Sequence, residues 1–430
     1  MSALESAFLG LESRDVPFHF ASILEVDRPI AVEQLRSHVD SVLGTIPRYR
    51  QRIVRSRWRG ARWVDVPDFR IENHVGAVTV AAPGGRRELD ELVAHLLETE
   101  LPAVQPPWRL WAVHGVEGGR GAVIALMHHS LVDGMAGFRL LQEVLRGPVP
   151  AALPPAPPPP SRRKTQLGAM RELVTWKNAR ALGKLLREGL TPADQLGINP
   201  RRVGRTRVVA SHTVDLDAVE QIEHAFSATN NDVVLATVTG ALRRLLIERG
   251  LDPDQMRDVR VMVPVGRHGK TAREAYGNRV VLLLVPIPVY EADPAACLQT
   301  IARATRHLKR SHTAAGGDLL VALSDVTLPA VLYGVLAIAL RMRAFNLIVT
   351  NVPGPPKPLS LLGTQLTRIV PIVNLWPHVA LGIAVASYAR SLTFGIQTDH
   401  AVIPDATRVR DHLAAAFEAL RDAAAHAHAA

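Results

Sequence analysis

The chain has 430 residues, of which 47% are hydrophobic and 21% are charged, and its formal net charge is +10. These fractions are close to globular averages and exclude a disordered or fibrous protein, while the length predicts two or three domains of ordinary size. The single cysteine, Cys297, excludes an internal disulfide, and no Cys/His spacing resembles a zinc site. We therefore expect a folded chain from a reducing compartment.

The first residues do not resemble a secretory signal, because they carry Glu5 and Glu12 and contain no continuous apolar core. We therefore expect a cytoplasmic protein. Apolar spacing then predicts strands and helices in the N-terminal part. The predicted elements are strands at Phe18–Val26 and Gly121–Met127, helices at Ala31–Leu43 and Glu88–Glu100, and a further helix containing Met135, Phe138, Leu141 and Leu145.

A proline-rich stretch at residues 147–165 divides the chain, because its prolines exclude a helix interior or a sheet. We interpret it as a linker. It separates an N-terminal lobe, residues 1–146, from a C-terminal lobe, residues 166–430, that begins with a basic helical segment. Neither part contains an internal repeat of solenoid length.

Most of the excess positive charge lies between Arg162 and Arg207. This segment has twelve basic and three acidic residues, and so carries nine of the ten net charges. The basic residues from Lys177 to Arg187 recur at helical spacing, which suits a helix on an anionic membrane or lipid-droplet surface, although a solvated helix face fits equally well. We expect no nucleic-acid partner, because no aromatic residues are interleaved with the charge.

The C-terminal part alternates helices and strands in the same way. Its longest apolar stretch, Leu319–Leu340, is interrupted by Asp325 and Pro329 and keeps roughly 15 clean residues, short of the ~20 of a membrane-spanning helix, so a buried or interfacial helix is expected. The pattern as a whole predicts a mixed α and β fold. The predicted elements are a helix at Val233–Leu246 after Asn231 and Asp232, and strands at Val259–Val263, Val280–Ile287 and Phe345–Thr350.

The residues most suited to chemistry are His128 and His129, at the end of a predicted strand. Side chains alternate along a strand, so only one of the two can face a shared site, and without a third ligand we expect no metal site. Acid/base chemistry remains for a histidine. Asp133 could orient the imidazole of His129 or hold the loop through an ion pair, and Gly134 permits an unusual backbone conformation.

The same segment has two other interpretations. A turn that happens to contain histidines would give the same pattern. A nucleophilic mechanism is disfavoured, because Ser130 lacks a Gly-x-Ser-x-Gly elbow and Cys297 has no histidine beside it in the sequence. Direct, base-assisted transfer is the simplest chemistry that remains.

Beyond the His-His-x-x-x-Asp-Gly segment, the chain contains several further short motifs in a characteristic order. In this order they resemble the bacterial wax ester synthases and acyl-coenzyme A:diacylglycerol acyltransferases, over most of the chain. The motifs are Pro107-Trp108, Met127–Gly134, Asn231–Ala236, Gly277-Asn278, Asn351–Pro355, Ser387-Tyr388, Asp399 and Pro404-Asp405.

The resemblance implies a chloramphenicol acetyltransferase-like architecture, with two similar α/β lobes around a central tunnel. It implies that His129 is the general base, which takes the proton of an alcohol as the oxygen attacks a thioester, and that coenzyme A leaves without a covalent enzyme intermediate. His128 would support it. Asp133 would be structural and would pair with Arg267, with His268 or Arg273 as alternatives. Acyl-coenzyme A would be a cosubstrate, with no bound cofactor.

The resemblance also indicates candidate substrate-binding residues: Trp108, Asn231, Asp232 and Asn278. The last three also have a simpler interpretation. Asn231 and Asp232 are more simply explained as caps of the helix that follows, and Asn278 as a turn residue after a glycine.

Three functions remain open at this point. The first is transfer of a fatty acyl group to diacylglycerol or a long-chain alcohol, which yields triacylglycerol or wax ester. The second is an acyltransferase of the same fold that acts on a specialised alcohol or amine. The third is a catalytically inactive protein that binds lipid inclusions, against which the intact histidine motif weighs.

Overall fold

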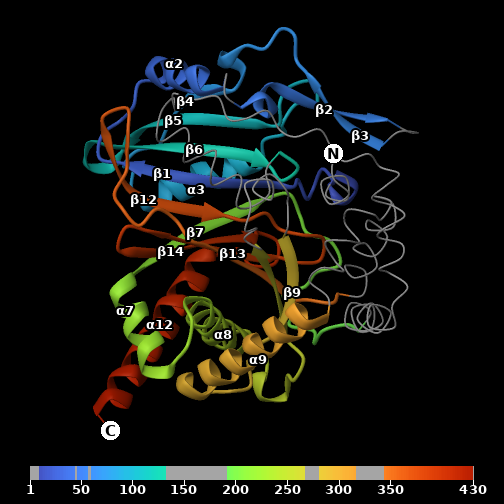
Figure 1. Ribbon diagram of the computed structural model, residues 1–430, viewed down its shortest axis with the longest axis vertical. Coiled ribbons are helices and arrows are strands. Elements are labelled where there is room, and N and C mark those ends of the chain that lie inside the picture. The colour runs from blue at the N-terminus through green and yellow to red at the C-terminus, as the bar shows by residue number, and fades with distance from the viewer. Residues whose placement is uncertain are drawn as a thin grey trace.

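Two mixed β-sheets form the centre of the protein, one above the other in Figure 1. The structure, a computed structural model, describes residues 9–43, 46–56, 60–131, 191–266, 280–315 and 343–429. Within these residues each of the two sheets has six strands. The predicted mixed α and β fold with two lobes is confirmed.

The first sheet has the strand order β11-β12-β1-β6-β5-β4, and β4 and β5 are its parallel pair. Helices α2 (Val32–Leu43) and α3 (Arg86–Leu97) pack against it. A separate two-stranded sheet consists of β2 (Gln51–Ser56) and β3 (Gly60–Asp65). The strands of the six-stranded sheet are β1 (His19–Val26), β4 (Val75–Thr79), β5 (Trp108–Val116), β6 (Arg120–His128), β11 (Ser360–Leu361) and β12 (Thr364–Ile372).

Strand β1 carries buried side chains on both of its faces. Leu24 and Val26 lie in the cluster that includes the apolar side chains of α2, whereas Ala21 and Ile23 lie in the cluster of α3. Because successive side chains point to opposite faces of a strand, the alternation places the two helices on opposite sides of the sheet. The strand that leads to the histidine motif, β6, is paired with β1 along its whole length.

The second sheet has the order β7-β14-β13-β10-β8-β9. Four helices cover its lower face in Figure 1. They are α7 (Leu216–Phe226), α8 (Asn230–Glu248), α9 (Pro294–Ala315) and α12 (Ala406–Ala429). The strands are β7 (Arg207–Asp215), β8 (Arg260–Gly266), β9 (Val280–Pro286), β10 (Leu347–Val352), β13 (Leu381–Tyr388) and β14 (Ser391–Asp399). The described residues also contain short 3₁₀ turns: η1 (Pro47–Arg50), η2 (Ile71–Asn73), η3 (Glu117–Gly119) and η4 (Pro253–Gln255).

Strand β12 connects the two lobes. It comes late in the sequence, yet it pairs antiparallel with β1, with Ile372 opposite Ala21. The division between the sheets therefore does not follow the proline-rich stretch, which lies outside the described residues together with residues 132–146 and 166–190. The lobe boundaries at residues 146 and 166 stay a prediction.

The two sheets meet closely where β12 faces β14. A Cβ at Gly395 of β14 would collide with the backbone carbonyl oxygen of Pro371 in β12. Gly395 is therefore needed for close backbone approach. A larger residue would push β12, and the segment that follows it, away from the second sheet.

A buried ion cluster also joins the sheets. Glu25 of β1 pairs with Arg86 of α3 at 2.5 Å and with Arg368 of β12 at 2.8 Å. The Arg368 guanidinium in addition donates hydrogen bonds to Ser211 and Thr213 of β7. One carboxylate thus fixes an arginine that reaches from the first sheet to the second.

The end of the basic segment is part of the lobe junction. Arg207 is 5% exposed, and its guanidinium donates to the carbonyl oxygens of Asp15 and Gly204. Its backbone N–H donates to Glu98, just after α3. Of the four arginines of this segment that the structure describes, Arg207 therefore has a structural position, whereas Arg201 and Arg202 are exposed.

Most predicted elements are confirmed within a few residues, and one predicted cap is corrected. Helix α3 begins at Arg86 and ends at Leu97, earlier than the predicted Glu88–Glu100. Helix α8 is capped by Thr229, ahead of the predicted Asn231 and Asp232, because Asp232 lies inside the first turn and accepts the Thr229 N–H. The predicted helix of Met135–Leu145 and the apolar stretch Leu319–Leu340 lie outside the described residues.

We predict that Glu25→Gln destabilises the protein by roughly 2–3 kcal/mol, because it leaves the partly buried Arg368 without its carboxylate and leaves Arg86 with only its longer, 3.4 Å pair with Asp90. The free energy of unfolding in urea measures this. The control is Glu91→Gln, which removes an exposed pair with Arg87 and should cost at most about 0.5 kcal/mol. Equal losses in the two variants would contradict a structural role for the buried cluster.

Candidate active site

The histidine motif begins at the last residue of β6. The backbone N–H of His128 donates to the carbonyl oxygen of Pro107, beside β5, at 3.0 Å. The N–H of His129 donates to the carbonyl oxygen of Phe18, beside β1, at 2.8 Å. The backbone of the two histidines is thus held between the neighbouring strands, which fixes where both imidazoles start.

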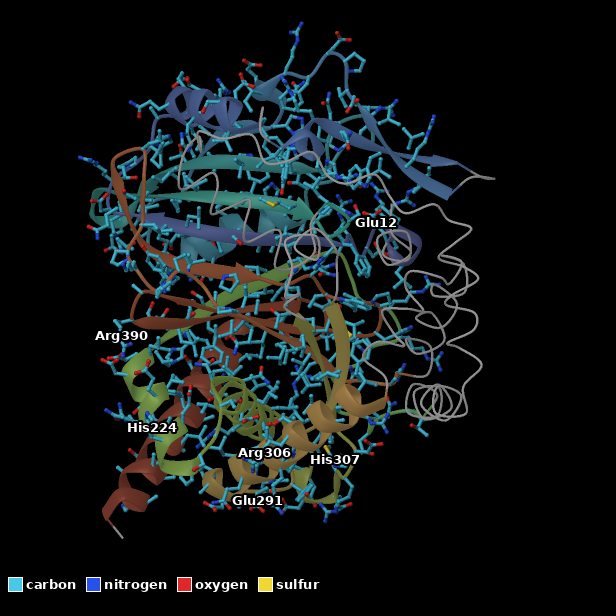
Figure 2. All side chains as sticks on the ribbon, in the orientation of Figure 1. Glu12, His224, Glu291, Arg306, His307 and Arg390 are labelled. Atoms are coloured by element: carbon cyan, nitrogen blue, oxygen red, sulfur yellow. The ribbon has the colours of Figure 1, made fainter. Side chains whose placement is uncertain are left out.

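His128 is held by an acidic partner that the sequence did not indicate. It is 3% exposed, and its Nδ1 accepts the backbone N–H of Ser130 at 3.1 Å. Because a backbone N–H can only donate, Nδ1 carries a lone pair and the ring proton is on Nε2. Nε2 lies 3.1 Å from Oε1 of Glu12 and donates to it. Glu12 is labelled in Figure 2, at the end of the sheet where β6 finishes.

Glu12 is a carboxylate at neutral pH. Burial by itself would raise its pKa, but the hydrogen bond from His128 and electrostatic interactions with His128, His19 and Arg55 lower the pKa below its usual value. Arg55 of β2 pairs with the second oxygen at 2.6 Å. Glu12 therefore connects the separate β2–β3 sheet with the motif, and both of its oxygens are in use.

A third histidine, His19, lies directly opposite His128 in the β1–β6 register. The rings meet edge to face with centroids 5.6 Å apart, and His19 is 4% exposed. Burial and the neighbouring His128 lower the pKa of His19 to about 3, against an opposing effect of Glu12. His19 is thus neutral near pH 7, and it belongs to the same side of the sheet as His128.

His129 has different surroundings. Its ring lies 5.1 Å from that of Phe20, and the residue is partly exposed. Burial of the ring and the neighbouring His128 lower its pKa to about 4, while a side-chain hydrogen bond with Asn374 acts to raise it. At neutral pH the imidazole is uncharged and therefore able to accept a proton.

The other residues predicted for the site are placed differently. Trp108 is 2% exposed, donates its indole N–H to the Tyr49 carbonyl oxygen at 2.9 Å, and stacks on His74 with ring centroids 4.5 Å apart. A cavity of about 520 Å³ lies beside Trp108 and His74, next to the β5 end that adjoins the motif. Trp108 thus combines a core position with a place in a cavity wall.

Asp232 takes part in the cap of α8, and its side chain is buried and does not face an open substrate site. It is 1% exposed; one oxygen accepts from Thr229 and the other from the hydroxyl of Thr305 at 2.6 Å. Asn231 lies beside it at the start of α8. Asp133, Gly134, Arg267 and Asn278 lie outside the described residues, so their predicted roles stay predictions.

Sequence reasoning did not indicate Glu12, His19 or Asn374 as site residues. Glu12 is 116 residues from His128 and Asn374 is 245 residues from His129, and neither belongs to a recognisable motif. Only the pairing of β1 with both β6 and β12 brings these segments together. Strand pairing over such separations leaves no local signal in the chain.

Comparison with known proteins decides the family. Residues 1–234 match the wax ester synthase/diacylglycerol acyltransferase catalytic domain, and residues 276–421 match the C-terminal domain of the same proteins. The chain belongs to the wax ester synthase/diacylglycerol acyltransferase family. It is an acyltransferase, and the resemblance inferred from the motifs is confirmed.

Individual relatives agree with this family over nearly the full chain. A Mycobacterium tuberculosis protein named as the diacylglycerol O-acyltransferase tgs2 is 31% identical over 97% of this chain and 98% of its own. The wax ester synthase/diacylglycerol acyltransferase of Marinobacter aquaeolei VT8 has a similar structure, with a TM-score of 0.74, 22% identity and 98% coverage of both chains.

Condensation domains of two synthetases have the same fold. The first condensation domain of the calcium-dependent antibiotic synthetase has a TM-score of 0.65 at 17% identity, over 98% of this chain and 95% of its own. The starter condensation domain of the rhizomide synthetase RzmA, solved with C8-CoA, has a TM-score of 0.63 at 14% identity, over 99% of this chain and 94% of its own. The chloramphenicol acetyltransferase-like architecture is thereby confirmed for this family member.

The lowered pKa values of His19 and His129 predict how stability changes with pH. Their folded pKa values of about 3 and about 4 lie below the usual 6.5, so between these values the unfolded chain binds more protons than the folded one. Stability should therefore fall as the pH falls from 6.5 towards 4. The midpoint of thermal unfolding measures this, and His19→Gln should make the fall shallower.

Other groups also titrate in this range, so the informative quantity is the difference between variant and wild type. His426→Ala, at an exposed position, controls for the loss of a histidine. If His19→Gln and the wild type lose stability in parallel between pH 6.5 and 4, the lowered pKa of His19 is wrong.

Proposed function

We propose that this family member transfers a fatty acyl group from acyl-coenzyme A to diacylglycerol or a long-chain alcohol, with His129 as general base. The observation that carries this proposal is the neutral imidazole of His129, part exposed and set against Phe20, while His128 is committed to Glu12. A neutral histidine at the end of β6 can take a hydroxyl proton at physiological pH.

The transfer needs one base and no covalent enzyme intermediate. The hydroxyl oxygen of the acceptor attacks the thioester carbonyl carbon as His129 takes the hydroxyl proton. The tetrahedral intermediate then collapses, the carbon–sulfur bond breaks, and His129 returns the proton to the departing coenzyme A sulfur. Burial disfavours the imidazolium, which favours rapid return of the proton.

Residues around His129 have supporting parts in this proposal. His128 is fixed by Ser130 and Glu12, and so holds the end of β6 in place. Asp133, with Gly134 at the following turn, is proposed as a structural anchor paired with Arg267. Both residues lie outside the described part of the chain. A double variant that exchanges the two residues, Asp133→Arg with Arg267→Asp, would test the pair.

The substrates are inferred from the relatives. The tgs2 protein is named as a diacylglycerol O-acyltransferase, the Marinobacter protein as a wax ester synthase as well, and the RzmA domain was solved with an acyl-coenzyme A. An acyl-coenzyme A donor and a lipid alcohol acceptor are therefore the substrates that we propose. A specialised alcohol or amine is the second candidate, because condensation domains have the same fold.

Contact with a lipid surface is also proposed, because the acceptor is a lipid. No helix among the described residues is both long and apolar enough to cross a membrane. The exposed Arg201 and Arg202, together with the basic residues 162–187 outside the described part, are the candidates for peripheral attachment to an anionic membrane or inclusion.

We predict that His129→Ala lowers the rate of thiol release from acyl-coenzyme A by at least about 100-fold, the lower range for loss of a general base. The free thiol is followed with an acceptor present, and circular dichroism monitors the fold. His95→Ala, at an exposed position of α3, is the matched control and should retain wild-type activity. A His129→Ala variant that turns over at the wild-type rate would exclude this base.

We predict that diacylglycerol or a long-chain alcohol supports thiol release far better than polar alcohols or amines. A panel of acceptors, with products identified by mass spectrometry, measures this preference. Activity on a polar metabolite, with none on either lipid alcohol, would overturn the proposed acceptor and favour the second candidate.

A further inference from the structure

Asn374 lies where the second half of the chain reaches the motif. It follows β12, two residues after Ile372, whose partner in β1 is Ala21. The side chain is 1% exposed, although it is a carboxamide with one oxygen and two N–H groups. A buried polar group of this kind needs hydrogen-bonding partners, and its partners indicate its role.

The segment around Asn374 is packed on the residue that fixes the His129 backbone. Trp376 stacks obliquely on Phe18 with ring centroids 5.3 Å apart, and Val373 and Leu375 are buried in the same cluster. The carbonyl oxygen of Phe18 in turn accepts the His129 N–H at 2.8 Å. The segment of Asn374 and the backbone of His129 therefore both contact Phe18, the residue just before β1.

The orientation of the carboxamide follows from its other contact. Nδ2 of Asn374 donates to the carbonyl oxygen of Leu375 at 3.0 Å, which identifies Oδ1 as the atom turned away from that carbonyl. The buried Oδ1 has no hydrogen-bond partner in bonding geometry within the described part of the chain, so it is an acceptor that still needs a donor. Asn374 is also the side chain that acts to raise the pKa of His129.

We infer that Asn374 is the positioning residue for His129. Its Oδ1 accepts the N–H of one ring nitrogen, which fixes the tautomer and the plane of the imidazole, and so directs the other ring nitrogen to the hydroxyl of the acceptor. This inference rests on the proposed role of His129 as general base.

The partner is an amide, and this has a chemical consequence. In a serine hydrolase triad a carboxylate orients the histidine and also stabilises the imidazolium. Asn374 can orient the ring without adding a charge. The titratable groups that act near His129 in the described residues are His128 and His19, and Glu12 is engaged with His128 and Arg55. The base is thus oriented while it stays neutral.

The test uses two substitutions at Asn374 with the full-length enzyme. Asn374→Ala should lower kcat by about 10- to 100-fold with KM within about twofold, because misorientation of a catalytic group impairs the chemical step rather than binding. Asn374→Asp should move the acidic limb of the kcat/KM profile upward by at least about one pH unit, because a carboxylate favours the imidazolium.

Asn346→Ala is the matched control. Asn346 is also a buried asparagine, at 2% exposure, and its carboxamide bonds the Asp194 carbonyl oxygen and the Arg260 N–H rather than His129. We expect it to lower the thermal midpoint and to leave the acidic limb in place. A merely structural role of Asn374 would give the same two results for the Asn374 variants and would overturn the inference.

The outcome also separates this inference from the proposed function. Loss of activity in His129→Ala, with unchanged kcat and acidic limb in both Asn374 variants, would remove the positioning role and leave His129 as base. Full activity in His129→Ala would instead remove the base, and the positioning role with it. A raised limb in Asn374→Asp, with a kcat defect in Asn374→Ala, supports the inference.

Discussion

The pairing of β12 with β1 is the interaction on which the candidate site depends. This pairing brings a strand from the second half of the sequence into the first sheet and carries Asn374 to the side of β1 opposite β6. The absence of a side chain at Gly395 lets the second sheet approach Pro371 closely, and the pair of Glu25 with Arg368 ties β12 to β1 and β7. Asn374 therefore reaches the site across the lobe junction, whereas His129 and its other neighbours come from the N-terminal part of the chain.

Around the motif, the structure separates two kinds of environment for adjacent histidines. His128 faces Ser130, Glu12 and the edge of His19, where a carboxylate and a defined tautomer hold it rigidly. His129 meets Phe20 and the neutral amide of Asn374, so burial keeps it uncharged. The two environments differ because successive side chains along an extended backbone point to opposite sides. His128 thus anchors the strand end, and His129 is left for the acid/base role that we propose.

Much of this fold was predictable from local patterns. The apolar spacing of β1, α2 and β6 is regular, and each element lies within a few residues of its prediction. The alternation argument for His128 and His129 agrees with their separate surroundings. Asp232 does take part in capping α8, as expected, but the N-cap is Thr229, and Asp232 closes the capping box from inside the first turn.

The remaining features depend on contacts between distant segments. Glu12 gives no signal as a lone acidic residue near the N-terminus, and Asn374 lies in an apolar stretch with no recognisable motif. Their importance follows from the register of β1 with two partners, which local propensity does not encode. His19 resembles any other strand residue until its register partner is known to be His128.

The central claim is that His129 is a neutral imidazole, ready to accept a proton, at physiological pH. The most direct measurement is an NMR titration of histidine-labelled protein, with the His129 ring signal assigned by its loss in His129→Gln. The account predicts that this signal keeps the chemical shift of a neutral ring from pH 7 down to pH 5, with a midpoint near the pKa of about 4. A midpoint near 6.5, the ordinary value for a solvated histidine, would contradict it.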